Sequence, residues 1–263
     1  MKEAPAAGRV LVETDGAVSW VTIDNPAKRN ALSVSMMNAL GESVDLLDAD
    51  PSVRVIVLRG AGTSAFAAGA DISEFEAQQN ETDGQQSSDL VMTSLFGALT
   101  AAETPVIAMI HGYCLGGGVA LALGADIRIA ADNSRFAIPA ARLGVGYPLA
   151  LAHALVGAAG PGMAAEILFT GRMLSADEAL RTGLVNRLLP AGELEGATRE
   201  LAATIAANAP LSVRAAKASI GAFASPQRNP VAESFIADCG KSADAREGQR
   251  AFMDKRRPSF TGA

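Results

Sequence analysis

The sequence predicts an α/β fold that ends in a helical module. Short apolar runs of strand length recur in the first part of the chain, and glycine-containing turns follow two of them. Residues 191–263 contain only helix-like segments. With 263 residues and 49% hydrophobic content, the chain can bury a sizeable core but is long for one ordinary domain. We therefore expect an α/β core over residues 1–190 and a C-terminal helical module over residues 191–263.

Charge and cysteine content limit the classes of partner. The chain has 22 basic and 28 acidic residues, a net charge of −6, and no basic block long enough to follow a phosphate backbone. The two cysteines, Cys114 and Cys239, favour a reducing compartment, because a chain of this length needs no disulfide. The N-terminal residues lack the apolar region of a signal peptide. We expect a cytoplasmic protein that binds neither nucleic acid nor membrane.

The chain opens with a predicted β-hairpin, because Asp15-Gly16 stands between two β-rich runs. Ser33 suits the N-cap of the helix that follows. The loop between hairpin and helix carries Lys28 and Arg29. These two cations are either solvated surface groups or contacts to a phosphate.

Two strand-to-turn segments leave backbone amides accessible. Residues 105–132 read as strand, tight turn, buried helix and strand, with Gly116, Gly117 and Gly118 in the turn. Glycine has no Cβ, so another molecule can lie against the backbone, and the first amides of a helix lack intrahelical partners. An upstream strand predicted over 53–58 is also followed by small residues. Two such turns can direct two N–H groups at one oxygen that gains negative charge. The alternative is close packing of helix on sheet.

The remaining elements follow from local signals. Residues 76–89 are polar and without apolar period, which predicts a mobile segment before a helix that ends near 103. Ser175 and the acids after it predict an N-cap and first turn. Asp126 is expected to bond backbone amides. The other predictions are strands over 126–130, 134–139 and 185–189, a loop over 142–148, a helix over 149–169 that breaks at 160–162, and helices over 194–208, 211–223, 231–239 and 243–254.

Four segments together resemble the enoyl-CoA hydratase/isomerase family, the crotonase superfamily, and stand in the family's order. They are AFAAGADI at 65–72, PVIAMIHGYCLGGG at 105–118, GRMLSADEALRTGLVNRLLP at 171–190 and FMDKRRPSF at 252–260. The resemblance implies a crotonase-like spiral of ββα units whose C-terminal helices form a trimerisation module. It also implies a homotrimer or dimer of trimers, and a CoA thioester bound as substrate without any further cofactor.

The resemblance also implies roles for particular residues. The backbone amides of Ala70 and Gly117 would form the oxyanion hole for the thioester carbonyl. The family's contacts to CoA fall on Lys28, Arg29, Ala31, Ala68, Asp71 and Ile72. Phe252 and Lys255 match positions that reach the adenine and phosphates, often those of a neighbouring subunit.

The chain departs from the family at the acid–base positions. Hydratases of the family use two glutamates, because adding water to a double bond needs one group to activate water and another to manage the α-carbon proton. Those positions hold Ala120 and Ala140. Tyr147 is the replacement candidate, as a proton donor or as a residue that only shapes the acyl pocket.

Three further side chains near the site have less specific interpretations. Arg142 could bind a carboxylate on the acyl group, although a surface or interface ion pair is the simpler expectation. His111 is expected to support its turn by hydrogen bonding, and Cys114 to be a small buried apolar residue. His111 and Cys114 lack the further ligands that a metal site needs, so we expect no metal.

The leading hypothesis is an acyl-CoA-processing lyase or isomerase of fatty acid metabolism that stabilises a thioester enolate. Isomerisation, hydrolysis or decarboxylation that uses a group other than glutamate remains open. The alternative from a different class is a catalytically silent acyl-CoA-binding homologue. RNA binding fits poorly with the net charge of −6, and the absence of a G-x-S-x-G motif excludes the common serine hydrolases.

Overall fold

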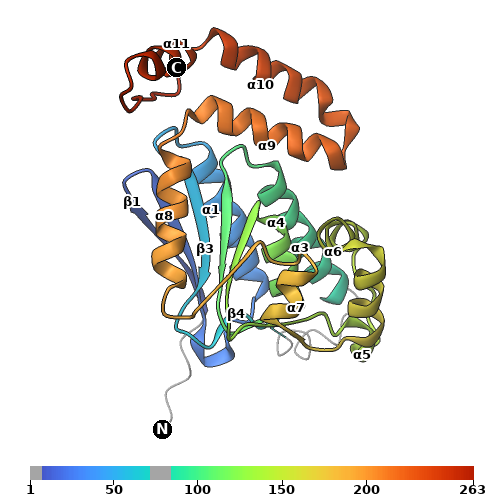
Figure 1. Cartoon of the computed structure of the whole chain (residues 1–263). Helices are drawn as coiled ribbons and strands as arrows, with labels where there is room; N and C mark the ends of the chain where they lie inside the picture. Colours follow the sequence, from blue (N-terminus) through green and yellow to red (C-terminus); the bar gives the residue numbers. More distant parts are fainter. Residues whose placement is uncertain (1–7, 72–83) are drawn as a thin grey trace.

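A six-stranded sheet forms the centre of the structure, a computed structural model that describes residues 8–71 and 84–263 (Figure 1). Its strand order is β1-β2-β3-β5-β7-β10. The β1–β2 hairpin is antiparallel, and the other neighbouring pairs are parallel. The strands are β1 (Arg9–Asp15), β2 (Val18–Asp24), β3 (Val55–Gly60), β5 (Val106–Ile110), β7 (Ile127–Ala131) and β10 (Arg187–Leu189).

A second sheet of four short strands stands beside the first, in the order β4-β6-β8-β9. Strands β4, β6 and β8 each follow a strand of the main sheet, and a helix comes after each such pair. This repeated ββα arrangement confirms the predicted fold class. The elements are β4 (Ala65–Ala67), β6 (Tyr113–Leu115), β8 (Arg135–Ala137), β9 (Leu174–Ser175), α3 (Gly84–Ala101), α4 (Gly117–Gly124) and α5 (Ala140–Leu143).

Both faces of the main sheet are covered, which explains why its central strands are continuously apolar. Ile56 and Leu58 on β3 pack with residues of α1 (Val34–Asp48), α3 and α4. The alternate residues Val55 and Val57 pack with Trp20 and with α8 (Leu194–Ala206) on the other face. The division at residue 190 stays a prediction, although α8 already belongs to the packing of the sheet.

The last three helices gather at one end of the molecule (Figure 1). They are α9 (Pro210–Ala224), α10 (Asn229–Lys241) and α11 (Ala243–Met253). Lys217 of α9 connects this group to the core, because its Nζ lies 2.9 Å from Asp126 Oδ2 and donates to the Thr104 carbonyl oxygen. The same Asp126 oxygen accepts from the Val106 amide at 2.7 Å, which confirms its predicted backbone role.

Two local boundaries differ from the predictions. Helix α3 begins at Gly84, inside the polar segment 76–89, and its Ser88 is buried; the mobility of this segment stays a prediction. The part of that segment over 76–83 lies outside the described residues. The predicted loop over 142–148 begins within α5, which ends where Gly144 adopts φ +70°.

Helix α6 (Leu149–Thr170) is interrupted at Gly160, which has non-helical backbone angles before Pro161, as the sequence predicts. By length and composition alone, α6 is the one helix within 8–71 and 84–263 that could cross a membrane. That criterion is weak, because core helices of other proteins also meet it. Leu151, Leu155 and Ile167 of α6 are buried in the core.

The two predicted serine caps are confirmed, since Ser33 accepts from the Met36 amide and Ser175 forms a capping box with Glu178 before α7 (Ala176–Arg181).

Asn30 connects the early loop to the turn between β3 and β4. It is fully buried, its Oδ1 accepts from the Asn25 amide at 3.0 Å, and its Nδ2 donates to the carbonyl oxygens of Ala61 and Ala65 at 3.0 and 2.7 Å. Asn30→Ala would leave these backbone groups without partners. We expect the free energy of unfolding to fall by about 3 kcal/mol in urea titrations.

The exposed Asn208, whose side chain forms no hydrogen bond within 8–71 and 84–263, provides the control. Asn208→Ala is expected to change the free energy of unfolding by less than about 0.5 kcal/mol. Equal losses in the two variants would contradict the structural role of Asn30.

Candidate active site

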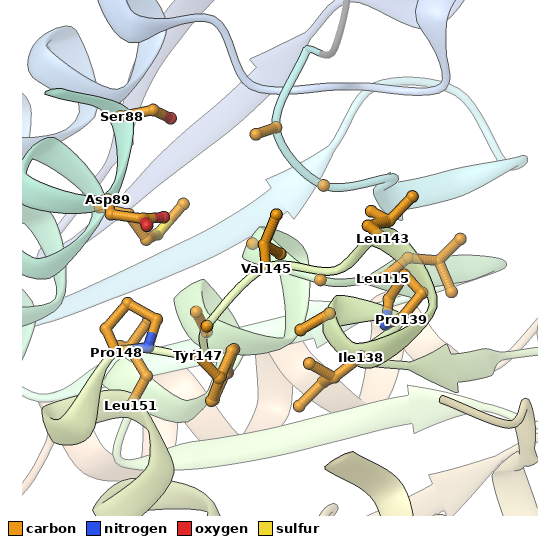
Figure 2. A pocket seen from close by; sticks show the side chains of 18 of the residues that line it. Ser88, Asp89, Leu115, Ile138, Pro139, Leu143, Val145, Tyr147, Pro148 and Leu151 are labelled. Carbon is orange, nitrogen blue, oxygen red and sulfur yellow. The ribbon is translucent and has the colours of Figure 1, made fainter. Parts of the chain in front are cut away.

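A pocket of about 410 Å³ lies between α3, the two glycine-containing turns, α5 and the start of α6 (Figure 2). Most of its wall is apolar. The apolar side chains include Met92, Leu115, Ile138, Leu143, Val145 and Leu151.

The first turn after β4 presents the Ala70 amide to this pocket. Leu32 donates to the Gly69 carbonyl oxygen at 2.8 Å, and the Asp71 amide donates back to Leu32 at 2.9 Å. Since neighbouring amides of an extended chain point in opposite directions, the Ala70 N–H is directed away from Leu32. It has no acceptor among residues 8–71 and 84–263.

The second turn brings the Gly117 amide to the same place. Gly116 adopts φ +50° and donates to the Ala137 carbonyl oxygen, whereas the Gly117 N–H has no acceptor in the described part of the chain. A β-carbon at Gly117 would lie 3.5 Å from the Ala70 nitrogen. The two unpaired amides are therefore neighbours, as the sequence predicts, and α4 adds its positive N-terminal end.

Ala120 and Ala140 both line the pocket. Ala120 is fully buried on α4, and Ala140 is the first residue of α5. The positions at which the resemblance implies glutamates thus face the pocket with methyl groups. Neither residue can transfer a proton.

Tyr147 also lines the pocket, next to Pro148 (Figure 2). Its hydroxyl is buried and has no hydrogen-bond partner among the residues described. Burial, and to a lesser extent the nearby Cys114, raises the pKa of Tyr147. The hydroxyl therefore stays protonated near neutral pH, where it could donate a proton or hydrogen bond but would not act as a base. Cys114 is buried and burial raises the pKa of its thiol, which fits the expected small apolar residue.

Sequence reasoning missed Asp89, a carboxylate in the pocket wall. The helical period contained a signal for it. Met92, Leu95 and Leu99 form the buried stripe of α3, and residues three or four positions earlier must face the same way. Ser88 and Asp89 occupy those positions. The polar composition of 76–89 concealed this extension of the stripe.

The predicted CoA contacts fall into two groups, and the first lies beside the pocket. Lys28 Nζ pairs with Asp71 Oδ2 at 2.6 Å, which connects the early loop to the first turn. Ala68 lines the pocket. Ala31 is buried and directly precedes Leu32, which bonds the first turn. The Arg29 guanidinium stands 5.2 Å from the centre of the Tyr113 ring. Ile72 lies outside the described residues.

The second group is not brought to the pocket by this chain. Phe252 is 84% exposed on α11, and Lys255 follows that helix with φ +54°. Helix α11 lies at the opposite end of the molecule from α5 (Figure 1). A contact from these residues to the pocket would have to come from another copy, as the resemblance implies.

One side-chain prediction needs correction, and a second stays untested in part. The Nε2 of His111 is buried without a partner, and its side chain forms no hydrogen bond within 8–71 and 84–263, so the expected support of the turn is absent. Its ring instead lines a different pocket with Arg59 and Asn133, where burial lowers the pKa of His111. Arg142 forms no ion pair in the described chain, and its Nε donates to the Thr170 carbonyl oxygen at 3.0 Å. An interface ion pair or a contact to an acyl carboxylate stays a prediction for this side chain.

The described residues contain no group of three or more His, Cys, Asp and Glu side chains that could hold a metal ion. Within the described residues, the pocket offers a pair of free amides, an apolar wall, one carboxylate and the hydroxyl side chains Ser88 and Tyr147. This combination suits a substrate with a carbonyl oxygen and an apolar chain.

Comparison with known proteins identifies the same family as the sequence resemblance. The profile of the enoyl-CoA hydratase/isomerase family matches residues 13–263. A short-chain-enoyl-CoA hydratase of Clostridium acetobutylicum is 34% identical over 94% of this chain and 95% of its own length. A carnitinyl-CoA dehydratase of Proteus mirabilis is 38% identical over 95% of this chain and 97% of its own length.

A crystal structure from Hyphomonas neptunium, described as an enoyl-CoA hydratase/isomerase family protein, matches the fold with a TM-score of 0.91. The two sequences are 38% identical, and the match covers 97% of this chain and 98% of the chain from Hyphomonas neptunium. The agreement of profile, sequences and structure extends over almost the whole chain. The protein therefore belongs to the enoyl-CoA hydratase/isomerase family, the crotonase superfamily.

Proposed function

We propose that this enzyme processes an acyl-CoA thioester by stabilising its enolate between the Ala70 and Gly117 amides. The observation that carries the proposal is the proximity, at the wall of one apolar pocket, of two amides that have no acceptor within residues 8–71 and 84–263. When a proton leaves the carbon beside a thioester carbonyl, negative charge develops on the carbonyl oxygen. Each donor that meets this charge contributes roughly 3 kcal/mol to lowering the barrier.

The names of the relatives support a CoA thioester as the substrate. One relative is named a short-chain-enoyl-CoA hydratase and another a carnitinyl-CoA dehydratase. The mostly apolar pocket fits an acyl chain. Lys28, Arg29, Ala31, Ala68, Asp71 and Ile72 remain the proposed contacts to CoA, and of these the two cations suit its phosphates. No separate cofactor is needed for this chemistry.

The exposed apolar residues of the C-terminal helices support the proposed homotrimer or dimer of trimers. Ile220, Phe223, Ile236, Phe252 and Met253 are each more than half exposed in the single chain. Large apolar side chains that gather at one end of a molecule indicate an interaction surface. We retain the cytoplasm as the proposed location.

A second candidate function is acyl-CoA binding without turnover. Ala120 and Ala140 favour it, because hydration by a pair of pocket carboxylates is impossible with two methyl groups at these positions.

For the same reason, hydration is the least supported of the possible reactions. Proton transfer at a carbon atom is the best supported reaction.

The test exposes the purified protein to saturated, enoyl and carboxyacyl-CoA thioesters in heavy water, with mass spectrometry of every species. We expect exchange of the α-carbon protons or movement of a double bond, because both need only an enolate and one proton-transfer group. Water addition, thioester cleavage and loss of carbon dioxide would each give a different mass change. Binding of the thioesters without any mass change would instead favour the silent acyl-CoA-binding function.

A further inference from the structure

Asp89 is the one carboxylate that lines the pocket among residues 8–71 and 84–263, and it has no partner there. It forms no ion pair or side-chain hydrogen bond within residues 8–71 and 84–263. The backbone carbonyl oxygen of Asp89 accepts a hydrogen bond from the Thr93 hydroxyl, so only the carboxyl group lacks a partner within the described residues. Figure 2 shows the carboxyl group extending from α3 into the pocket, on the side opposite Pro139 and Leu143.

The position of Asp89 on α3 relates it to the oxyanion turn. Met92 follows it by three residues and therefore lies on the same face of the helix. The Met92 methyl carbon stands against Gly117, since a β-carbon on Gly117 would lie 2.9 Å from it. The face of α3 that carries Asp89 thus packs directly on the turn whose amide is free.

A carboxylate in this setting is poised for proton transfer. Burial raises the pKa of Asp89 above its ordinary value, and no cation is present to stabilise the charged form among the residues described. A carboxylate with a raised pKa is a stronger base than an ordinary one, and more of it is in the acid form near neutral pH, so the group can both accept and return a proton. The other titratable side chain that lines the pocket within the described chain, Tyr147, stays protonated.

Resting on the proposed function, we propose that Asp89 is the catalytic acid–base residue that moves a proton between carbon atoms of the bound acyl-CoA. It would replace the missing carboxylates from a different wall of the pocket, because it stands on α3 whereas Ala120 and Ala140 stand on α4 and α5.

The step balances without another reactant. An Asp89 oxygen takes the α-proton, the C–H electron pair forms the enolate double bond, and the carbonyl π pair moves to the oxygen held by the Ala70 and Gly117 amides. If the acyl chain carries a double bond between its β- and γ-carbons, Asp89 returns the proton to the γ-carbon. The π pair between the β- and γ-carbons forms the new C–H bond, the enolate pair becomes a double bond between the α- and β-carbons, and an oxygen lone pair restores the carbonyl. Without such a double bond Asp89 returns a proton to the α-carbon, and in heavy water its carboxyl proton first exchanges with solvent, so the α-carbon gains deuterium.

One carboxylate therefore suffices for isomerisation of a 3-enoyl-CoA to a 2-enoyl-CoA. Hydration would require a second group to hold and activate water. The inferred substrate class is a CoA thioester with an acidic α-carbon and an unsaturated chain.

The experiment compares wild-type protein with Asp89→Asn, Asp89→Glu and Asp45→Asn. Asp45 is an exposed aspartate on α1 and serves as the matched control. α-Proton exchange of a saturated acyl-CoA in heavy water and conversion of the matching 3-enoyl-CoA are both measured. Thioester binding is measured separately by calorimetry, and folding by thermal unfolding.

We expect Asp89→Asn to lower both rates by at least about a hundredfold, with unchanged thioester binding and melting temperature. Asp89→Glu should restore part of the activity, and Asp45→Asn should keep all of it. Wild-type rates in Asp89→Asn would overturn the role of Asp89 and leave the proposed function intact. A parallel loss of binding or folding in Asp89→Asn, with no rescue by Asp89→Glu, would also overturn it. Binding by the wild-type protein without any exchange or conversion would overturn the proposed function itself.

Discussion

Gly117→Pro is expected to lower turnover of a CoA thioester by about 10²–10³-fold, the usual effect of losing one oxyanion-hole donor. Proline lacks the backbone N–H that we assign to the substrate oxygen. Gly117 is the first residue of α4, directly after Gly116 as N-cap, and this is the helical position that proline favours. The substitution should therefore delete one hydrogen-bond donor while α4 still forms.

The matched control for this variant is Gly117→Ala, which keeps the amide. Its β-carbon would approach the methyl end of Met92 at 2.9 Å, and a flexible methionine can move aside. We expect Gly117→Ala to retain most of the activity, measured as α-proton exchange and product formation under saturating thioester. If alanine and proline reduced the rate to the same extent, crowding and not the missing N–H would be responsible.

Gly112→Ala is expected to have the largest effect on stability, a loss of more than about 4 kcal/mol that could prevent folding. Gly112 stands between β5 and β6 with φ +57°, and an added β-carbon would overlap the backbone carbonyl oxygen of Ser64. The β-carbon is fixed to the backbone of residue 112, and the oxygen belongs to the backbone of Ser64. Because neighbouring strands hold both backbone segments, neither atom can move away without a large cost in free energy. The readout is the yield of soluble protein and its denaturant midpoint.

Gly16→Ala separates the two causes of strain in that variant. Gly16 adopts φ +60° in the β1–β2 hairpin turn, and a β-carbon there would meet no atom within 4 Å. It carries only the left-handed backbone cost, about 1–2 kcal/mol. A loss in Gly112→Ala that merely equals the loss in Gly16→Ala would mean that the close approach to Ser64 is unimportant.

Features with local causes could be predicted from the sequence. The hairpin at Asp15-Gly16, the serine caps and the break at Gly160 each depend on residues within a few positions of one another. The convergence of the two turns was also predictable, because repeated strand-to-turn units place successive turns on the same edge of the fold, and the family resemblance implied Ala70 and Gly117 as the two amides. These amides belong to the backbone, so side-chain detail was not needed.

Features that depend on contacts distant in sequence could not be predicted in this way. The polar start of α3 includes the buried Ser88, and no local propensity indicates this burial. The pairing of Lys28 with Asp71 joins residues 43 positions apart, and the unpartnered ring of His111 depends on which pocket it enters. Asp89 was missed because the polar composition of residues 76–89 suggested a solvated segment. The helical period of α3, in contrast, places Asp89 on the buried face of the helix.

The strand order of the main sheet has a consequence for aggregation. Its two edges are β1 and the short β10, and an unpaired edge strand offers free backbone groups to other chains. Arg9 and Glu13 place charged side chains along β1, and Pro190 directly follows β10. Charged, short and proline-ended edges discourage the addition of further strands. Uncontrolled sheet growth is thereby opposed at both ends, even when the chain is concentrated.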